Sequence, residues 1–286
     1  MSLTRTCLIL VSVVVAGVAG RPAAGAVYGP CRFDSQTLRF GGTVAETTAC
    51  LLRKVRERGS GADPQPVPSW LLDRVARPVS FTAAKLQRYL QAKGVASSDI
   101  TDRLVLGDTP ERRYFVIHDT SSPEIPTSAT VFPSNIDAPS YSGNNLSGWG
   151  STAQRVNLII SRDGRSRRLR EWGSSRPLPA TKIEQNNRVP AARKVFVHVE
   201  NIQPRIKPPG TWAWRAPQPG FSPAQEQRLA LAYIVASLRA GRWLIPAYHF
   251  NIDQGLPDVH DDPQHADLAS WVERVAAIEA EIAAID

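Results

Sequence analysis

The five histidines of this 286-residue chain lie at positions 118, 198, 249, 260 and 265, in the ends of predicted strands or in loops near carboxylates. Two imidazoles and one carboxylate, with a fourth position left to water, form the ligand set of a catalytic zinc ion. Such an ion lowers the pKa of its bound water to about 7 and can polarise a carbonyl group. The histidines are therefore the first candidates for a functional site.

Short apolar runs are expected to position three of these histidines. The run Tyr114–His118 is apolar on both faces, which is typical of a buried central strand that ends at a polar residue. In the predicted strand over residues 195–200, alternation places His198 and Glu200 on the same face, so either of them could face a reacting water molecule.

The chain divides into a front region, residues 27–105, and a second region, residues 106–286. In the front region, a capping box at Thr43 predicts a helix that runs through Val55 and stops near Gly59, and a second helix is predicted over residues 83–93. The second region is predicted to contain a long loop over 119–154, a hairpin over 156–171, a helix over 223–238 and a final helix from Asp267. A loop as long as 119–154 is typical of an active site.

The N-terminal segment is expected to direct export to the periplasm or the cell exterior. Residues 1–26, with a basic start, an apolar run and small residues at the end, are typical of a secretory signal peptide. The apolar run is shorter than a membrane-spanning helix requires, and no later stretch qualifies, so no membrane span is predicted. In an exported chain, Cys31 and Cys50 are expected to form a disulfide, the alternative being two buried thiols.

Composition and charge narrow the classes of partner. A chain that is 42% hydrophobic and 21% charged is an ordinary globular protein, which excludes disordered and fibrous classes. The formal net charge of +8 favours an anionic partner, but an exported chain without a nucleic-acid motif is not expected to bind nucleic acid. Arg162, in a basic hairpin, is a candidate contact for peptide carboxylates, with a solvated face as the alternative. Trp149, in a loop, is a candidate to stack on a sugar, with packing that only holds its loop in place as the alternative.

Several segments of the second region match, in order, the motifs of a known family. They are Val116–Thr120, Asn157–Gly164, Phe196–Asn201, the helix from Pro223 followed by Ile245-Pro246 and His249, and Asp262-Pro263. Over residues 110–280 the chain thereby resembles the zinc-dependent N-acetylmuramoyl-L-alanine amidases, which share a fold with the peptidoglycan recognition proteins. The resemblance implies an α/β fold with a mixed central sheet flanked by helices, which follows the small helical region predicted over residues 27–105.

The resemblance also implies a ligand set and a reaction. His118, His249 and Asp262 correspond to the family's ligands for Zn²⁺. The implied activity is hydrolysis of the amide bond between N-acetylmuramic acid and L-alanine, with peptidoglycan or muropeptides as the partner. A peptidoglycan-binding protein of the same fold that does not cleave is the alternative.

Departures from the family pattern leave three roles open. The interval between His249 and the closing aspartate is longer than in the family, so His260 or Asp261 could replace Asp262 as a ligand. His260 stands where the family often has a lysine that stabilises the oxyanion, and a protonated imidazole could do the same.

The third open role is that of the general base. His198 occupies the position of the family's glutamate, and Glu200 follows two residues later. A carboxylate is the usual base in such a site, which favours Glu200.

Overall fold

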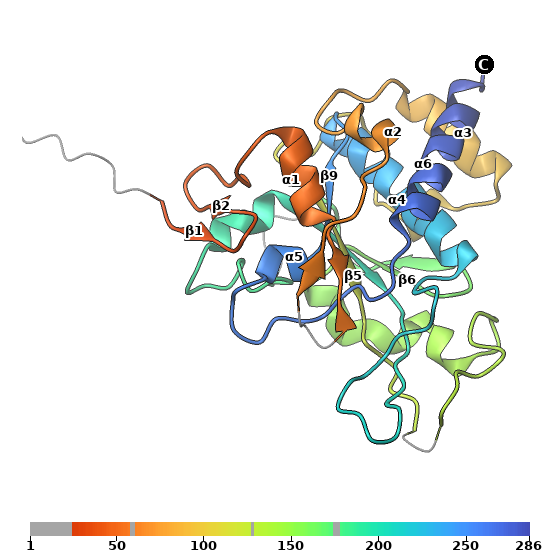
Figure 1. Ribbon diagram of the computed structural model, residues 1–286. Coiled ribbons are helices and arrows are strands. Elements are labelled where there is room, and N and C mark those ends of the chain that lie inside the picture. The colour runs from red at the N-terminus through yellow and green to blue at the C-terminus, as the bar shows by residue number, and fades with distance from the viewer. Residues whose placement is uncertain (1–24, 58–60, 127–128, 174–177) are drawn as a thin grey trace, which may run out of the picture.

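The computed structural model describes residues 25–57, 61–126, 129–173 and 178–286. Its centre, where Figure 1 labels β5, β6 and β9, is a sheet. The sheet has five strands in the order β7-β6-β8-β5-β9. The strands are β5 (Tyr114–Asp119), β6 (Leu158–Ile160), β7 (Ser166–Arg168), β8 (Phe196–Asn201) and β9 (Ile245–Tyr248). All neighbouring pairs are parallel except β6 and β7, which form the antiparallel hairpin at one edge. The predicted α/β class with a mixed central sheet is confirmed.

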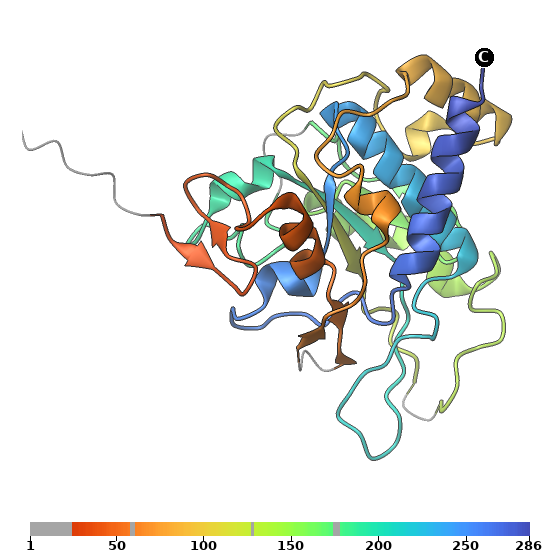
Figure 2. The ribbon, with the colours of Figure 1, turned by 45° about the horizontal axis from the view of Figure 1, so that its top comes forward.

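Helices flank this sheet. The α-helices are α1 (Val44–Leu51), α2 (Ser69–Leu72), α3 (Ala83–Ala92), α4 (Pro223–Ala240), α5 (His249–Asp253) and α6 (Leu268–Ala283), and the 3-10 helices are η2 (Ser97–Asp99), η3 (Ser142–Asn144), η4 (Leu146–Gln154) and η5 (Pro190–Lys194). Ser222 and Asp267 cap α4 and α6 through their side chains, as their residue types predict. Figure 2 shows α6 lying along α4, and α4 in turn packs on β6 and β8.

The two faces of the sheet meet different neighbours. Phe115 packs edge-on against Tyr233 of α4, with ring centroids 5.3 Å apart. Tyr114, on the opposite face, packs against Phe40 of the N-terminal region at 5.0 Å. Because side chains alternate along a strand, His118 shares the face of Tyr114 and lies four residues further toward the carboxyl end of β5. The N-terminal region therefore covers the start of this face, and the histidine lies at its far end.

Short strands accompany the predicted helices of the N-terminal region. They form two antiparallel pairs, β1 (Val27–Tyr28) with β2 (Phe33–Asp34) and β3 (Lys54–Val55) with β4 (Ala62–Asp63). The predicted helix from Thr43 ends at Leu51, before Val55. The side chain of Asn251 in α5 donates hydrogen bonds to the carbonyl of Leu51, the last residue of α1, and to that of Arg53 just beyond it, at 3.0 and 2.8 Å. The helix therefore stops where α5 meets it.

The predicted disulfide between Cys31 and Cys50 is present and ties α1 to the segment before it. Buried apolar side chains of this region join those of the sheet and of α4 and α6 in a single hydrophobic cluster. The predicted signal peptide, residues 1–26, lies outside the described residues apart from its last two positions.

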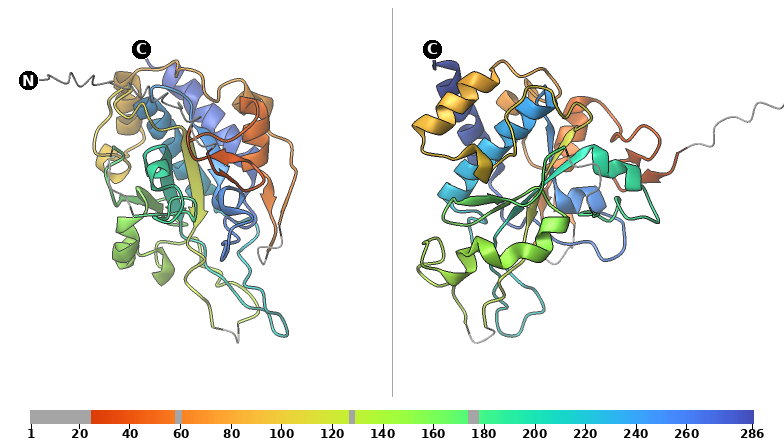
Figure 3. Two further views of the ribbon diagram at one scale, coloured as in Figure 1. Left: turned by 90° about the vertical axis from the view of Figure 1, so that its left-hand side faces the viewer. Right: turned by 180° about the vertical axis from the view of Figure 1, so that it is seen from behind.

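Long loops follow the carboxyl ends of β5 and β8 and extend from the same end of the molecule (Figure 3). In the part of the chain that the structure describes, no helix is both long and apolar enough to cross a membrane.

A buried arginine joins α4 to the segment before β5. The guanidinium of Arg239 is fully buried and pairs with Asp102 and, at 2.7 Å, with Asp108. Burial alone would raise the pKa of Asp102, but the bond from Arg239 lowers it below its ordinary value. Arg103 contacts the same two carboxylates from the surface, with 60% of its side chain exposed.

Arg239→Met is expected to lower the free energy of unfolding by about 3 kcal/mol, because two partly buried carboxylates lose their partner. Arg103→Met removes a partner of the same carboxylates on the solvent side and should lower it by less than about 1 kcal/mol. Urea denaturation followed by circular dichroism measures both values, and equal losses would contradict the assignment. Since the pKa of Asp102 is lower in the folded chain, this stabilisation is present above the unfolded pKa of about 3.9 and disappears as the pH falls through the folded value.

Candidate metal centre

The register of three parallel strands brings two histidines and a glutamate to one edge of the sheet. His118 lies directly beside Glu200 in the β5–β8 pair. On the other side of β5, Ile117 pairs with Tyr248, the last residue of β9, so His249 follows next to His118. The rings of the two histidines have centroids 4.4 Å apart. The carboxyl edge of the parallel strands, where sites in α/β sheets usually lie, is thus lined with groups that can bind a metal.

Asp262 completes a buried triad with the two histidines. Its Oδ2 lies 3.6 Å from His118 Nδ1, and its Oδ1 lies 2.9 Å from His249 Nδ1. Each residue is at most 3% exposed, and one ligand atom from each lies within 4.8 Å of the others. Tetrahedral zinc with bonds of about 2.0–2.2 Å separates its ligand atoms by roughly 3.4 Å. The observed separations bracket that value, so this triad could hold a metal ion.

Of the three alternatives for the third ligand, only Asp262 lies in the triad. The neighbouring Asp261 accepts a hydrogen bond from Gln264 Nε2 at 2.7 Å instead. His260 is exposed, and its ring centroid lies 5.6 Å from that of His249. The longer interval after His249 is therefore accommodated in the loop, and the aspartate of the Asp-Pro pair still reaches the site.

A buried ion pair fixes the loop that carries Asp262. Nη2 of Arg205 lies 2.7 and 2.8 Å from the two carboxylate oxygens of Asp119, and both residues are at most 5% exposed. Asp119 Oδ2 also accepts a hydrogen bond from the backbone N–H of Gln264 at 3.0 Å. The backbone N–H of Asp119 donates to Asp262 Oδ2 at 3.3 Å. The pair thus ties the end of β5 to the loop on both sides of its proline.

The second ring nitrogen of each ligand histidine has a partner within the protein. His249 Nε2 lies 2.9 Å from Asp253 Oδ2. His118 Nε2 lies 2.9 Å from Nδ1 of His198, which is 2% exposed. Partners of this kind orient an imidazole and leave its other nitrogen directed at the metal position. His198, an alternative for the base, accordingly lies behind His118.

Burial and pairing make the two ligand histidines electrostatically different. Burial, aided by the nearby His249, lowers the pKa of His118 to about 3, so this imidazole is neutral. Burial alone would also lower the pKa of His249, but Asp262 and Asp253 raise it well above its usual value. The same pairing lowers the pKa of Asp262 against the effect of burial. A bound cation would take the place of the proton between His249 and Asp262.

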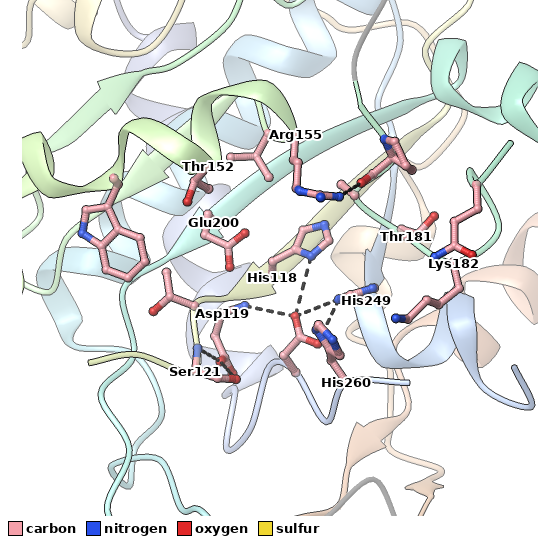
Figure 4. Close-up of a pocket in the computed structure, with 17 residues that line it drawn as sticks. His118, Asp119, Ser121, Thr152, Arg155, Thr181, Lys182, Glu200, His249 and His260 are labelled. Atoms are coloured by element: carbon pink, nitrogen blue, oxygen red, sulfur yellow. Dashed lines mark hydrogen bonds and ion pairs between the residues drawn. The ribbon is translucent and has the colours of Figure 1, made fainter. Parts of the chain in front are cut away.

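A cavity of about 520 Å³ opens over the triad (Figure 4). Its walls include His118, Asp119, Trp149, Thr152, Arg155, Lys182, Glu200, His249, His260 and Asp262. Burial raises the pKa of Glu200 well above its usual value, and the carboxylates of Asp262 and Asp119 raise it further. The size lies in the range of small-molecule sites. Glu200 is therefore the alternative for the base that faces this space.

Trp149 lines the cavity, whereas Arg162 does not. Arg162 is 2% exposed, and its Nε donates to Asp137 Oδ1 at 2.6 Å. Its Nη1 donates to the carbonyl of Gly220 at 2.6 Å. The expectation that Arg162 contacts a ligand is therefore wrong. Its guanidinium is already bound inside the protein, where it links two loops. The arginine that lines the cavity is Arg155, at the end of η4.

The sequence pattern does not reveal Lys182, Glu184, Arg205 or Asp253, all of which shape the site. Lys182 and Glu184 lie in a segment with neither helical nor strand periodicity, and Arg205 meets its partner only through the fold. Asp253 lies four residues after His249 in α5. An i, i+4 spacing on a helix is the one signal that could have indicated this contact.

The site combines a buried donor set for a divalent cation with an open cavity and a carboxyl group beside it. Such a combination suits hydrolysis assisted by a metal ion. Comparison with family models, with curated proteins and with solved structures found no match to this chain.

Metal binding by the triad can be measured on the purified protein after removal of metal with a chelator. We expect one Zn²⁺ or Co²⁺ per chain by calorimetry and by competition with a chelating dye. His118→Ala, His249→Ala and Asp262→Ala each remove a ligand and should weaken binding by more than about 100-fold, beyond the effect of losing a supporting residue. Asp261→Asn is the matched control and should leave the affinity unchanged. Unchanged affinity in the His118 variant would refute the ligand assignment.

Proposed function

We propose that the protein is a zinc-dependent hydrolase that cleaves the amide bond between N-acetylmuramic acid and L-alanine. The observation that carries the proposal is the buried triad of His118, His249 and Asp262 at the floor of a cavity that Glu200 also lines. Two imidazoles and one carboxylate, with the remaining side open, are the donor set of catalytic zinc sites.

In the proposed reaction, a bound zinc ion would activate water and Glu200 would transfer the proton. A zinc ion, when bound, lowers the pKa of a water molecule and polarises the substrate carbonyl. Glu200 accepts the proton of the attacking water and passes it to the leaving amine of L-alanine. Its position beside His118 on the adjacent strand, and a pKa raised by burial, suit a group that both takes and returns a proton.

Two cationic side chains are candidates to stabilise the negative charge that develops on the carbonyl oxygen. His260 lines the cavity and, when protonated, can donate to this oxygen. Lys182 lines the same cavity, and its ammonium has no hydrogen-bond or ion-pair partner among the residues described. Lys182 is the stronger candidate because its ammonium, on a flexible stem, offers three hydrogen-bond donors to this oxygen.

The substrate class rests on the family motifs in the sequence and on the walls of the cavity. Trp149 offers an aromatic face to a sugar, and Arg155 offers a cation to the carboxylates of a stem peptide. The disulfide between Cys31 and Cys50 fits a protein exported to the compartment that contains the cell wall.

The decisive experiment incubates the zinc-loaded protein with purified muropeptides, with and without a chelator. Mass spectrometry should detect free stem peptides that begin with L-alanine, and only in the metal-containing sample. His118→Ala should release none, whereas Asp261→Asn should match the unmodified protein. Retained binding to peptidoglycan without release of peptide would instead support the non-catalytic alternative.

Glu200→Gln is expected to lower kcat by about 10²–10⁴-fold, because it removes the group that transfers the proton. Its affinity for zinc should stay close to that of the unmodified protein, since Glu200 lies outside the triad. Steady-state kinetics and metal titration on the same preparation separate the two effects. A variant that loses zinc as well would show that Glu200 is a ligand.

Lys182→Met keeps the length of the side chain and removes its charge. It should lower kcat by about 10²–10³-fold, the usual effect of losing one oxyanion donor. His260→Gln provides the comparison, and we expect the smaller loss there, because the glutamine amide can still donate a hydrogen bond to the carbonyl oxygen. A larger loss in the His260 variant would reverse the assignment.

A further inference from the structure

Behind the metal triad, three buried side chains form a chain of hydrogen bonds that ends at Glu184. His118 Nε2 lies 2.9 Å from His198 Nδ1, and His198 Nε2 lies 3.1 Å from Glu184 Oε1. The exposed fractions of His118, His198 and Glu184 are 3%, 2% and 0%. We propose that Glu184, acting through His198, sets the tautomer of His118 and so is a positioning residue of the metal site.

Glu184 can only accept hydrogen bonds in this environment. Its Oε2 already accepts from the backbone N–H groups of Ala180 and Thr181, at 3.1 and 2.9 Å, and from the hydroxyl of Thr181 at 3.0 Å. Burial alone would raise its pKa, but His198 and these donors lower it to about 2. Glu184 is therefore an ionised carboxylate, and its free oxygen requires a donor from His198.

This requirement determines the positions of the remaining protons. When His198 donates its one ring proton from Nε2 to Glu184, its Nδ1 carries a lone pair that can accept. His118 must then donate from Nε2, which leaves the lone pair on its Nδ1, the atom that faces Asp262. A metal ligand needs such a free lone pair.

Asp262, on the other side of the His118 ring, does not compete effectively with His198 for the ring proton of His118. Asp262 Oδ2 lies 3.6 Å from His118 Nδ1, too far for a hydrogen bond, whereas the contact with His198 is 2.9 Å. The oxygens of Asp262 lie closer to His249 Nδ1, at 2.9 and 3.0 Å. Asp262 is thus engaged by His249, and the chain from Glu184 determines the tautomer of His118.

The segment that holds Glu184 also supports the other ligand histidine. The backbone N–H groups of Lys182 and Ile183 donate to Asp253 at 2.6 and 3.2 Å, and Asp253 accepts from His249 Nε2. One short stretch of chain, residues 180–184, therefore orients both imidazoles, each through a carboxylate. This inference rests on the metal site of the proposed function and is independent of the substrate.

Glu184→Gln tests the proposal with little change of shape. The glutamine oxygen can satisfy the three donors at residues 180 and 181, so its NH₂ group faces His198 Nε2. His198 must then donate from Nδ1, and His118 must accept at Nε2 and carry its proton on Nδ1. Long-range ¹H–¹⁵N NMR of the metal-free protein at pH 8 should show this change of tautomer. Competition with a chelating dye should show a 10–100-fold loss of Zn²⁺ affinity.

Two controls separate this effect from a general loss of charge or packing. Glu273→Gln removes a charge from the exposed face of α6 and should change neither reading. His198→Gln replaces the ring with an amide that can accept from His118 and donate to Glu184, so the tautomer and the affinity should persist. His198→Leu cannot do either and should lose affinity by 10–100-fold.

The proposal is overturned if folded Glu184→Gln protein keeps the Nε2–H tautomer of His118 and binds Zn²⁺ within twofold of the unmodified protein. If that variant does not fold, the pair of His198 variants decides. Equal affinities for His198→Gln and His198→Leu would overturn the proposal as well. Activity on muropeptides enters none of these readings, so failure of the proposed reaction would be recognised separately.

Discussion

The parallel alignment of β5 with β8 and β9 is the constraint on which the site depends. Because the three strands end nearly level, the polar residues that terminate them meet at one edge: His118 beside Glu200, and His249 one position beyond Tyr248. Buried apolar side chains of the same strands hold this register from below, packed on α4 on one face and on the N-terminal region on the other. A slip of one residue would turn every one of these side chains to the opposite face.

Bringing ionisable groups out of water costs free energy unless they are paired, and most of the groups around this site are paired. Three carboxylates outside the triad are paired in this way: Asp119 with Arg205, Asp253 with His249, and Glu184 with His198. Replacing such pairs with apolar residues often stabilises a protein, so their presence around one cavity indicates a purpose other than folding stability. We infer that these pairs hold two imidazoles and one aspartate in the geometry and protonation that a metal ion needs.

Local patterns in the sequence predict much of the fold. The capping box at Thr43, the apolar run before His118 and the Ser-Pro start of α4 each depend on neighbours in the chain, and all are found. The predicted helix extends past the true end of α1, where the carbonyl of Leu51 accepts a hydrogen bond from Asn251, two hundred residues further on. Short strands such as β1 to β4 carry too little periodicity to be distinguished from loops.

In the candidate site, too, local sequence indicates some residues and only the three-dimensional fold identifies the others. The histidines stand out because strands lead into them, but adjacent residues such as Asp261 and Asp262 cannot be separated until the loop is placed in three dimensions. The residue type of Arg162 and the basic hairpin around it suggest a ligand contact. Its surroundings are those of a structural residue, and only the packing of distant loops reveals them. Glu184 and Arg205 act entirely through such long-range contacts.

Whether the triad binds zinc can be seen directly in a crystal structure of the zinc-loaded protein, with anomalous diffraction recorded on both sides of the zinc absorption edge. We predict a single strong anomalous peak at the triad. It would mark a zinc ion bound by His118 Nδ1, His249 Nδ1 and a carboxylate oxygen of Asp262, with its fourth coordination position open toward the cavity. A peak elsewhere, or none at this triad in protein that is fully loaded with zinc, would contradict the assignment of the metal site.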